Sequence, residues 1–299
     1  MPSPYIIVTA AVALGVGIDT LVKAIALDLS VLTLTTWRFL FGSGFALTLF
    51  VVRRRPMPTL GAIRFHVLRG VVQLTTALSF FWALTQIALA EATVMGFMAA
   101  LMVPAMGRLI LKEKISPVAT AAAIAGFCGA AFALSAQATG GPDGNRVAGA
   151  LAAFTAAVGY ALTLILIRLR TRHEDTDTIA MFGNVMPATL LVVVMVVLNV
   201  ASPTAPALFP TLSSVLPLFA LGAIAFSVWW LMSEAYRHVE AQRLAPFEYL
   251  ALPMSVAAGY FVFGEVPSWR LYLGATVIIA GCLAIAFEDR LPIKRLKTG

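Results

Sequence analysis

Apolar stretches long enough to cross a lipid bilayer follow one another along almost the whole chain. A helix needs about 20 apolar residues to span roughly 30 Å of hydrocarbon, and the sequence holds ten such stretches. They run near residues 5–26, 31–52, 67–88, 92–111, 117–137, 147–168, 178–199, 213–235, 241–263 and 270–288. Only short connectors separate them, so no room is left for a separate soluble domain.

These stretches predict helices and not the strands of a barrel. A membrane strand alternates apolar and polar residues, whereas the run of residues 190–198 is apolar throughout. Hydrophobic residues make up 60% of the chain and charged residues 12%, about half the charged fraction of a soluble protein. We therefore predict an all-α, polytopic membrane protein with ten transmembrane helices.

The basic residues predict the orientation of the chain, because cytoplasmic loops retain Lys and Arg. With the N-terminus inside, 17 of the 21 basic residues fall on the cytoplasmic side. They are Arg53, Arg54, Arg55, Arg64, Arg69, Arg108, Lys112, Lys114, Arg168, Arg170, Arg172, Arg237, Arg243, Arg290, Lys294, Arg295 and Lys297. We expect a multi-pass protein of the cytoplasmic (inner) membrane with both termini in the cytoplasm.

Several functions are disfavoured by the same pattern. The net charge of +7 comes from residues that flank apolar segments, and not from one basic face that would suit nucleic acid. No HExxH, GxSxG or Gly-Lys-Ser/Thr phosphate loop is present, so we expect no enzyme and no cofactor. The acidic run Glu174, Asp175 and Asp177 could attract a divalent ion, but it is interpreted as a solvated loop, and no metal site is predicted.

The second half of the sequence repeats the first. Residues 90–92 (Ala-Glu-Ala) match 239–241 (Val-Glu-Ala), and residues 37–39 (Trp-Arg-Phe) lie opposite 182–184 (Phe-Gly-Asn). Five helices per half is an odd number, so the halves must cross the membrane in opposite directions. Such inverted repeats are typical of secondary transporters, whose substrate site lies near the midplane between the halves. We divide the chain into repeats at 1–140 and 141–299.

With these residues set out, the chain resembles the EamA-like ten-helix carriers of the drug/metabolite transporter superfamily. The resemblance rests on the stretch Trp37-Arg38-Phe39 and on the segment from Pro253 through Gly264-Glu265 to Gly274 and Gly281. The first half departs from this pattern, because Lys112 replaces the glycine before Glu113.

Within that group the chain is most similar to YddG-type amino-acid exporters. The resemblance implies export of aromatic and other neutral amino acids by alternating access, with small molecules and the bilayer as partners and a monomer as the functional unit. A carrier for other metabolites or cationic drugs is the alternative within transport. A membrane-embedded enzyme or sensor would need a catalytic constellation or an output domain, and the sequence contains neither.

Three charged residues inside the predicted helices are candidates for the substrate site, because a charge in the bilayer is costly and usually functional. Asp19 either contacts substrate or pairs with Lys23 four residues later. Arg38 either binds a carboxylate or locks the helix ends. Glu248 lies between Pro246 and Pro253, which should free the backbone carbonyls of Gln242 and Tyr249 to line a cavity.

Aromatic pairs complete the predicted site. Phe80, Phe81 and Trp82 in the first half correspond in place to Trp229 and Trp230 in the second. One ring of each pair could stack on an apolar substrate side chain, or the rings could face lipid. The predicted substrate-binding residues are Asp19, Arg38, Trp82, Trp230, Glu248 and Tyr249.

Overall fold

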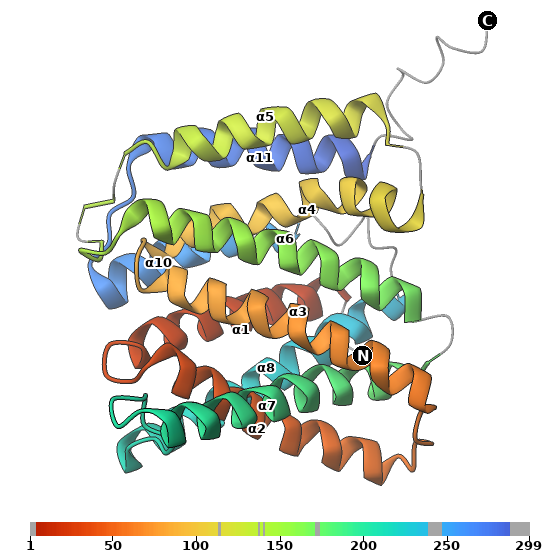
Figure 1. Cartoon of the computed structure of the whole chain (residues 1–299). Helices are drawn as coiled ribbons and strands as arrows, with labels where there is room; N and C mark the ends of the chain where they lie inside the picture. The colour runs from red at the N-terminus through yellow and green to blue at the C-terminus, as the bar shows by residue number, and fades with distance from the viewer. Residues whose placement is uncertain are drawn as a thin grey trace, which may run out of the picture.

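The computed structural model describes residues 4–112, 115–136, 138–139, 141–170, 174–238 and 247–287. These residues form ten α-helices, as predicted (Figure 1). The first five are α1 (Pro4–Ile25), α2 (Val31–Val52), α3 (Leu60–Leu84), α4 (Leu89–Leu111) and α5 (Pro117–Ala133). The second five are α6 (Arg146–Arg170), α7 (Thr176–Ala201), α8 (Leu212–His238), α10 (Ala251–Phe263) and α11 (Trp269–Ala286).

Short polar side chains set where several helices begin. The hydroxyl of Ser30 accepts the amide of Thr33 at the start of α2, and Ser116 does the same for α5. A hydroxyl in this position satisfies an amide that has no partner within the helix. Asp175 caps α7 in the same way, by accepting the amides of residues 177 and 178.

Two predicted boundaries were wrong. Helix α3 begins at Leu60 and ends at Leu84, whereas hydropathy placed it at 67–88. The Thr59 cap starts the helix early, so the polar residues Arg64 and His66 lie on its first turns. The ninth predicted helix, 241–263, is regular only from Ala251, and residues 239–246 lie outside the described part of the chain.

Seven helices, α1–α4 and α6–α8, are long and apolar enough to cross a bilayer, counting only described residues. The shorter apolar helices α5, α10 and α11 lie in the same bundle (Figure 1). Helix α4 is the most enclosed of the seven, with 61% of its apolar window buried against 24–44% for the others. Helix α4 therefore lies in the interior of the bundle, where it contacts helices of both halves.

The helix contacts have the symmetry of an inverted repeat. Helices α1 and α6 are equivalent in the two halves, as are α3 and α8, and α4 and α10. Helix α1 packs on α8 and α10, and helix α6 packs in the same way on α3 and α4. Helix α2 packs on α8 as α7 packs on α3, and the pairs α2–α7, α4–α10 and α5–α11 join equivalent helices. Exchanging the two five-helix halves thus preserves the contact pattern.

The two ends of the bundle can be named from the loops. The loops after α1, α3, α5, α7 and α10 lie together at one end, here called the first-loop end (Figure 1). Helix α1 begins at the opposite end, here called the N-terminal end (Figure 1). Because α1 ends where α6 begins, equivalent helices of the two halves run in opposite directions.

Glycines fix the register of the two halves. A Cβ at Gly70 on α3 would lie 2.6 Å from the Cβ of Met186 on α7, and one at Gly222 on α8 would lie 2.6 Å from the Cβ of Phe41 on α2. Only glycine permits such close approach of two helices. These matched contacts make Gly70 equivalent to Gly222 and Phe41 equivalent to Met186. By the same register Arg38 is equivalent to Gly183, as the sequence repeat predicted.

Candidate functional site

Arg38 lies on α2, about two turns from the first-loop end, and its guanidinium is held among aromatic rings. The Cζ atom is 4.3 Å from the ring centroid of Phe39 and 5.9 Å from that of Phe81. Its buried Nε has no hydrogen-bond partner among the described residues. A guanidinium can bind a carboxylate through two parallel N–H donors, so this side chain retains unused capacity for an anionic group.

Asp19 on α1 is the charge that faces Arg38. The two side chains interact electrostatically, but no ion pair within 4.0 Å joins them in the described part of the chain. Both are partly buried. A Cβ at Gly15, one turn below Asp19 on the same face of α1, would meet nothing within 4 Å, so space is open beside this face. Two opposite charges therefore interact here without forming a direct ion pair among the described residues.

Lys23 does not pair with Asp19, so that structural alternative was wrong. Its Nζ lies 2.5 Å from Oε1 of Glu265 and 2.9 Å from the carbonyl oxygen of Ile87. Glu265 also accepts the amide of Leu89, at the start of α4, at 2.8 Å. The ion pair is buried, with Lys23 5% and Glu265 2% exposed. It ties the end of α1 to the α10–α11 loop and to α4.

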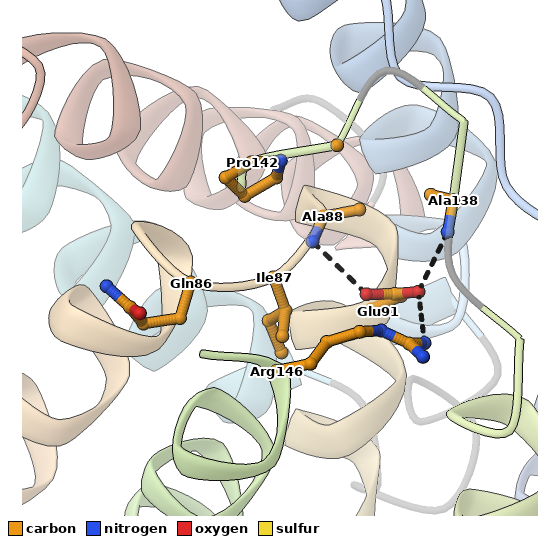
Figure 2. A pocket seen from close by; sticks show the side chains of 8 residues that line it. Gln86, Ile87, Ala88, Glu91, Ala138, Pro142 and Arg146 are labelled. Carbon is orange, nitrogen blue, oxygen red and sulfur yellow. Dashed lines mark hydrogen bonds and ion pairs between the residues drawn. The ribbon is translucent and has the colours of Figure 1, made fainter. Parts of the chain in front are cut away.

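A second buried carboxylate, Glu91, lies at the same end of the molecule. It accepts the amides of Ala88 and Ala138 at 3.2 and 3.3 Å and pairs with Arg146 at 2.9 Å (Figure 2). These groups border a narrow, shallow pocket. Its lining residues are Gln86, Ile87, Ala88, Glu91, Ala138, Gly141, Pro142 and Arg146. Both carboxylate oxygens of Glu91 are bonded to groups of the protein itself. We therefore assign this cluster to closure of the first-loop end.

Glu248 and Tyr249 lie immediately before α10, toward the N-terminal end. The Tyr249 ring packs edge-on against Phe97 of α4, with centroids 5.3 Å apart. Its hydroxyl lies beside the thiol of Cys282 on α11. The partly buried carboxylate of Glu248 interacts electrostatically with Tyr249 and with Tyr160 of α6. Tyr249 thus joins the segment before α10 to α4 and α11, with Tyr160 of α6 near Glu248.

The expected free carbonyl at Tyr249 is contradicted. Its oxygen accepts the amide of Leu252 at 3.1 Å. Pro253 occupies the first turn of α10, where an amide would have no partner within the helix in any case. The proline therefore starts α10 and does not break it. The equivalent expectation for Gln242 falls on a residue outside those described.

The aromatic candidates differ in where their rings lie. Trp82 on α3 is 39% exposed and Trp230 on α8 is 47% exposed. Phe81, the neighbour of Trp82, is 5% exposed and lies against Arg38. Adjacent residues on a helix point about 100° apart, so only one of the two α3 rings can face the Arg38 guanidinium. That ring is Phe81.

The acidic run before α7 is not a solvated loop. Asp177 is 8% exposed and pairs with Arg53 at 2.9 Å and with Arg55 at 2.7 Å, which joins α7 to the end of α2. The hydrogen bond that Arg55 donates to the Asp177 carboxylate raises the pKa of Arg55. Glu174 contacts the buried His66 of α3 at 2.8 Å. Sequence reasoning missed these pairs because their members lie more than 100 residues apart.

The comparisons with known proteins decide the family. The model of the "EamA-like transporter family" matches twice, over residues 3–135 and 147–287. The chain belongs to the EamA-like transporter family. This multi-pass carrier is therefore built from two copies of the EamA unit, and it is not an enzyme.

Relatives of this EamA-like carrier are named for different substrates. An S-adenosylmethionine uptake transporter of Rickettsia bellii is 27% identical over 75% of this chain and 73% of its own. A riboflavin transporter of Rhizobium johnstonii is 31% identical over 60% of this chain and 55% of its own. The pseudopaline exporter CntI of Pseudomonas aeruginosa is 23% identical over 74% of each chain.

A crystal structure supports the same fold for the EamA-like carrier. It superposes with a TM-score of 0.56 at 23% sequence identity and covers 93% of this chain and 98% of its own. The similarity extends over both halves of the chain and supports the fold alone.

Proposed function

We propose that the protein exports amino acids, both aromatic and other neutral ones, by alternating access between its two inverted halves. The observation that carries this proposal is the pair Asp19 and Arg38, two partly buried opposite charges without a direct ion pair. An amino acid is a zwitterion, so its ammonium and carboxylate match the two charges. A buried charge that lacks a partner is costly, and the substrate would supply partners for both.

Rings around Arg38 support a preference for apolar side chains. Phe39 and Phe81 are buried and lie within 6 Å of the guanidinium. An aromatic substrate ring packed there would gain about 0.5–1.5 kcal/mol beyond simple burial. Trp82 and Trp230 are proposed to contribute at the margins of this site, since their rings are partly exposed.

Glu248 and Tyr249 are proposed as the contact for substrate on its way from the N-terminal end. They lie next to Tyr160 and before the start of α10, whereas Asp19 and Arg38 lie near the ends of α1 and α2 that face the first-loop end. A carboxylate and phenol there would hold a substrate ammonium before it reaches the Asp19–Arg38 pair.

The distribution of charge supports an orientation for this transport. Described loops and helix ends at the N-terminal end carry many basic residues, while the first-loop end carries Lys23, Arg146 and Arg270. Positive residues stay in the cytoplasm, so we place both termini in the cytoplasm of the inner membrane and the first-loop end outside. The repeats 1–140 and 141–299 act as the two moving halves of one monomer.

A second candidate is carriage of a larger metabolite that combines an amino-acid group with a heteroaromatic ring. The relatives named as S-adenosylmethionine uptake transporters favour it. S-adenosylmethionine carries an α-amino acid group, which the same charge pair would bind. Transport of cationic drugs fits less well, because it would leave Arg38 without a counterion.

The proposal is tested by transport into proteoliposomes. Radiolabelled tryptophan, alanine, S-adenosylmethionine, riboflavin and a cationic dye are compared at equal concentration. We expect saturable tryptophan transport that falls about tenfold or more in Arg38→Gln, because a charge-assisted hydrogen bond contributes about 1.5–3 kcal/mol. Arg64→Gln, at an exposed position on α3, is the matched control. Saturable transport of the dye alone contradicts the proposal.

A further inference from the structure

Lys23 lies directly above Asp19 on the same face of α1. Residues four apart on a helix are neighbours, with Cβ atoms about 5–6 Å apart. Lys23 is the one nearer the first-loop end, because α1 ends at Ile25. The Lys23–Glu265 ion pair therefore covers the Asp19–Arg38 pair on the side of the first-loop end.

Two carboxylates compete for this one ammonium. In the structure Lys23 is bonded to Glu265 and to the Ile87 carbonyl, and its ring contact is with Phe263 at 5.4 Å. The electrostatic partner of Asp19 is Arg38. A lysine has four flexible methylenes and a compact charge, so rotation of its side chain would bring Nζ from Glu265 to Asp19 one turn below.

The Lys23–Glu265 bond must break when the first-loop end opens, because it joins α1 to the α10–α11 loop and to the start of α4. A buried ammonium left without its partner is strongly unfavourable. Asp19 is then the nearest replacement on the same helix face. A lysine bound there occupies the position that a substrate ammonium would need.

We infer that Lys23 is a switch that exchanges Glu265 for Asp19 and so expels the substrate ammonium when the first-loop end opens. This inference rests on the proposed function, since it assumes that Asp19 holds that ammonium. With the end closed, Glu265 holds Lys23 and leaves Asp19 to the substrate. With the end open, Lys23 neutralises Asp19, which lowers affinity on the release side. Lys23 is thus a positioning residue for release.

Removing either member of the ion pair separates this switch from a purely structural bond, because the two changes should act in opposite directions. In Lys23→Gln nothing displaces the substrate, so tryptophan affinity at the first-loop face should rise about tenfold. In Glu265→Gln the lysine stays on Asp19, so tryptophan affinity should fall. Loss of a shared structural bond would move both variants the same way. Lys23→Arg keeps the positive charge, so its tryptophan affinity should stay near that of the wild type.

The experiment measures competition for tryptophan transport in proteoliposomes of defined orientation, with tryptophan and indole-3-propionate, which lacks the ammonium. The rise in affinity caused by Lys23→Gln should appear for tryptophan and not for indole-3-propionate. It should also vanish when Asp19→Asn is present. The same effect on both compounds, or its persistence with Asn at position 19, overturns the switch. If tryptophan is transported but Lys23→Gln leaves its affinity unchanged, the switch alone fails. If the wild type carries no tryptophan, the proposed function fails with it.

Discussion

Replacing Gly274 with alanine should force apart the two helices α5 and α11. A Cβ at this position would collide with the carbonyl oxygen of Gly129 and lie 2.7 Å from the Cβ of Ala133, both on α5. These are backbone and near-backbone atoms, so no flexible side chain can move away. Overpacking of this kind costs about 1–3 kcal/mol. Since close helix contacts between small residues drive association in membranes, this cost should appear as lost stability.

The assay is thermal unfolding in detergent, followed by intrinsic tryptophan fluorescence. At roughly 2–4 °C per kcal/mol for chains of 150–250 residues, the Tm of Gly274→Ala should fall by several degrees. The matched control is Gly44→Ala on α2, where an added Cβ meets nothing within 4 Å. That change should hold or raise the Tm, because alanine favours helix over glycine by about 1 kcal/mol. Equal Tm values for Gly274→Ala and the wild type would refute the close crossing.

Three further outcomes are expected. Glu248→Gln should insert normally and lower tryptophan flux about tenfold, at about 1.4 kcal/mol per decade; unchanged flux at matched protein levels would make Glu248 a structural partner. Phe81→Ala should reduce the preference for tryptophan over alanine more than Trp82→Ala does, measured as a ratio of KM values, and the reverse order would place the inward ring at Trp82. In a cysteine-free background, Asp28→Cys should react with an impermeant reagent in intact cells and Met57→Cys only after permeabilisation; the opposite pattern would invert the topology.

The helices and their symmetry could be predicted because both depend on local patterns. Apolar length determines a membrane span, and an odd number of spans per half requires inversion. The equivalence of Arg38 with Gly183 followed from the repeat and agrees with the glycine contacts of α3 and α8. Boundaries such as the start of α3 were missed because a Thr59 cap outweighs hydropathy at a helix end.

Partner choice in the candidate site could not be predicted from sequence. Lys23 has Asp19 four residues away, yet it pairs with Glu265, 242 residues along the chain. Local spacing favours the first pair, and only the packing of α1 against α10 favours the second. The inward position of Phe81 over Trp82 likewise depends on how α3 is rotated against α2. Such choices are set by tertiary contacts that periodicity does not contain.

If Asp19 and Arg38 together hold a zwitterion, three ligands that differ only in their charged groups should bind with different affinities. Tryptophan carries both charges, tryptamine lacks the carboxylate and indole-3-propionate lacks the ammonium. Competition for tryptophan transport gives the affinity of each for the wild type, Arg38→Gln and Asp19→Asn.

The wild type should bind tryptophan at least about tenfold more tightly than either analogue, as expected for one lost charge-assisted contact. Arg38→Gln should abolish the advantage of tryptophan over tryptamine and keep its advantage over indole-3-propionate. Asp19→Asn should do the reverse. If each variant instead weakens all three ligands by the same factor, the two charges do not contact the substrate and the account is contradicted.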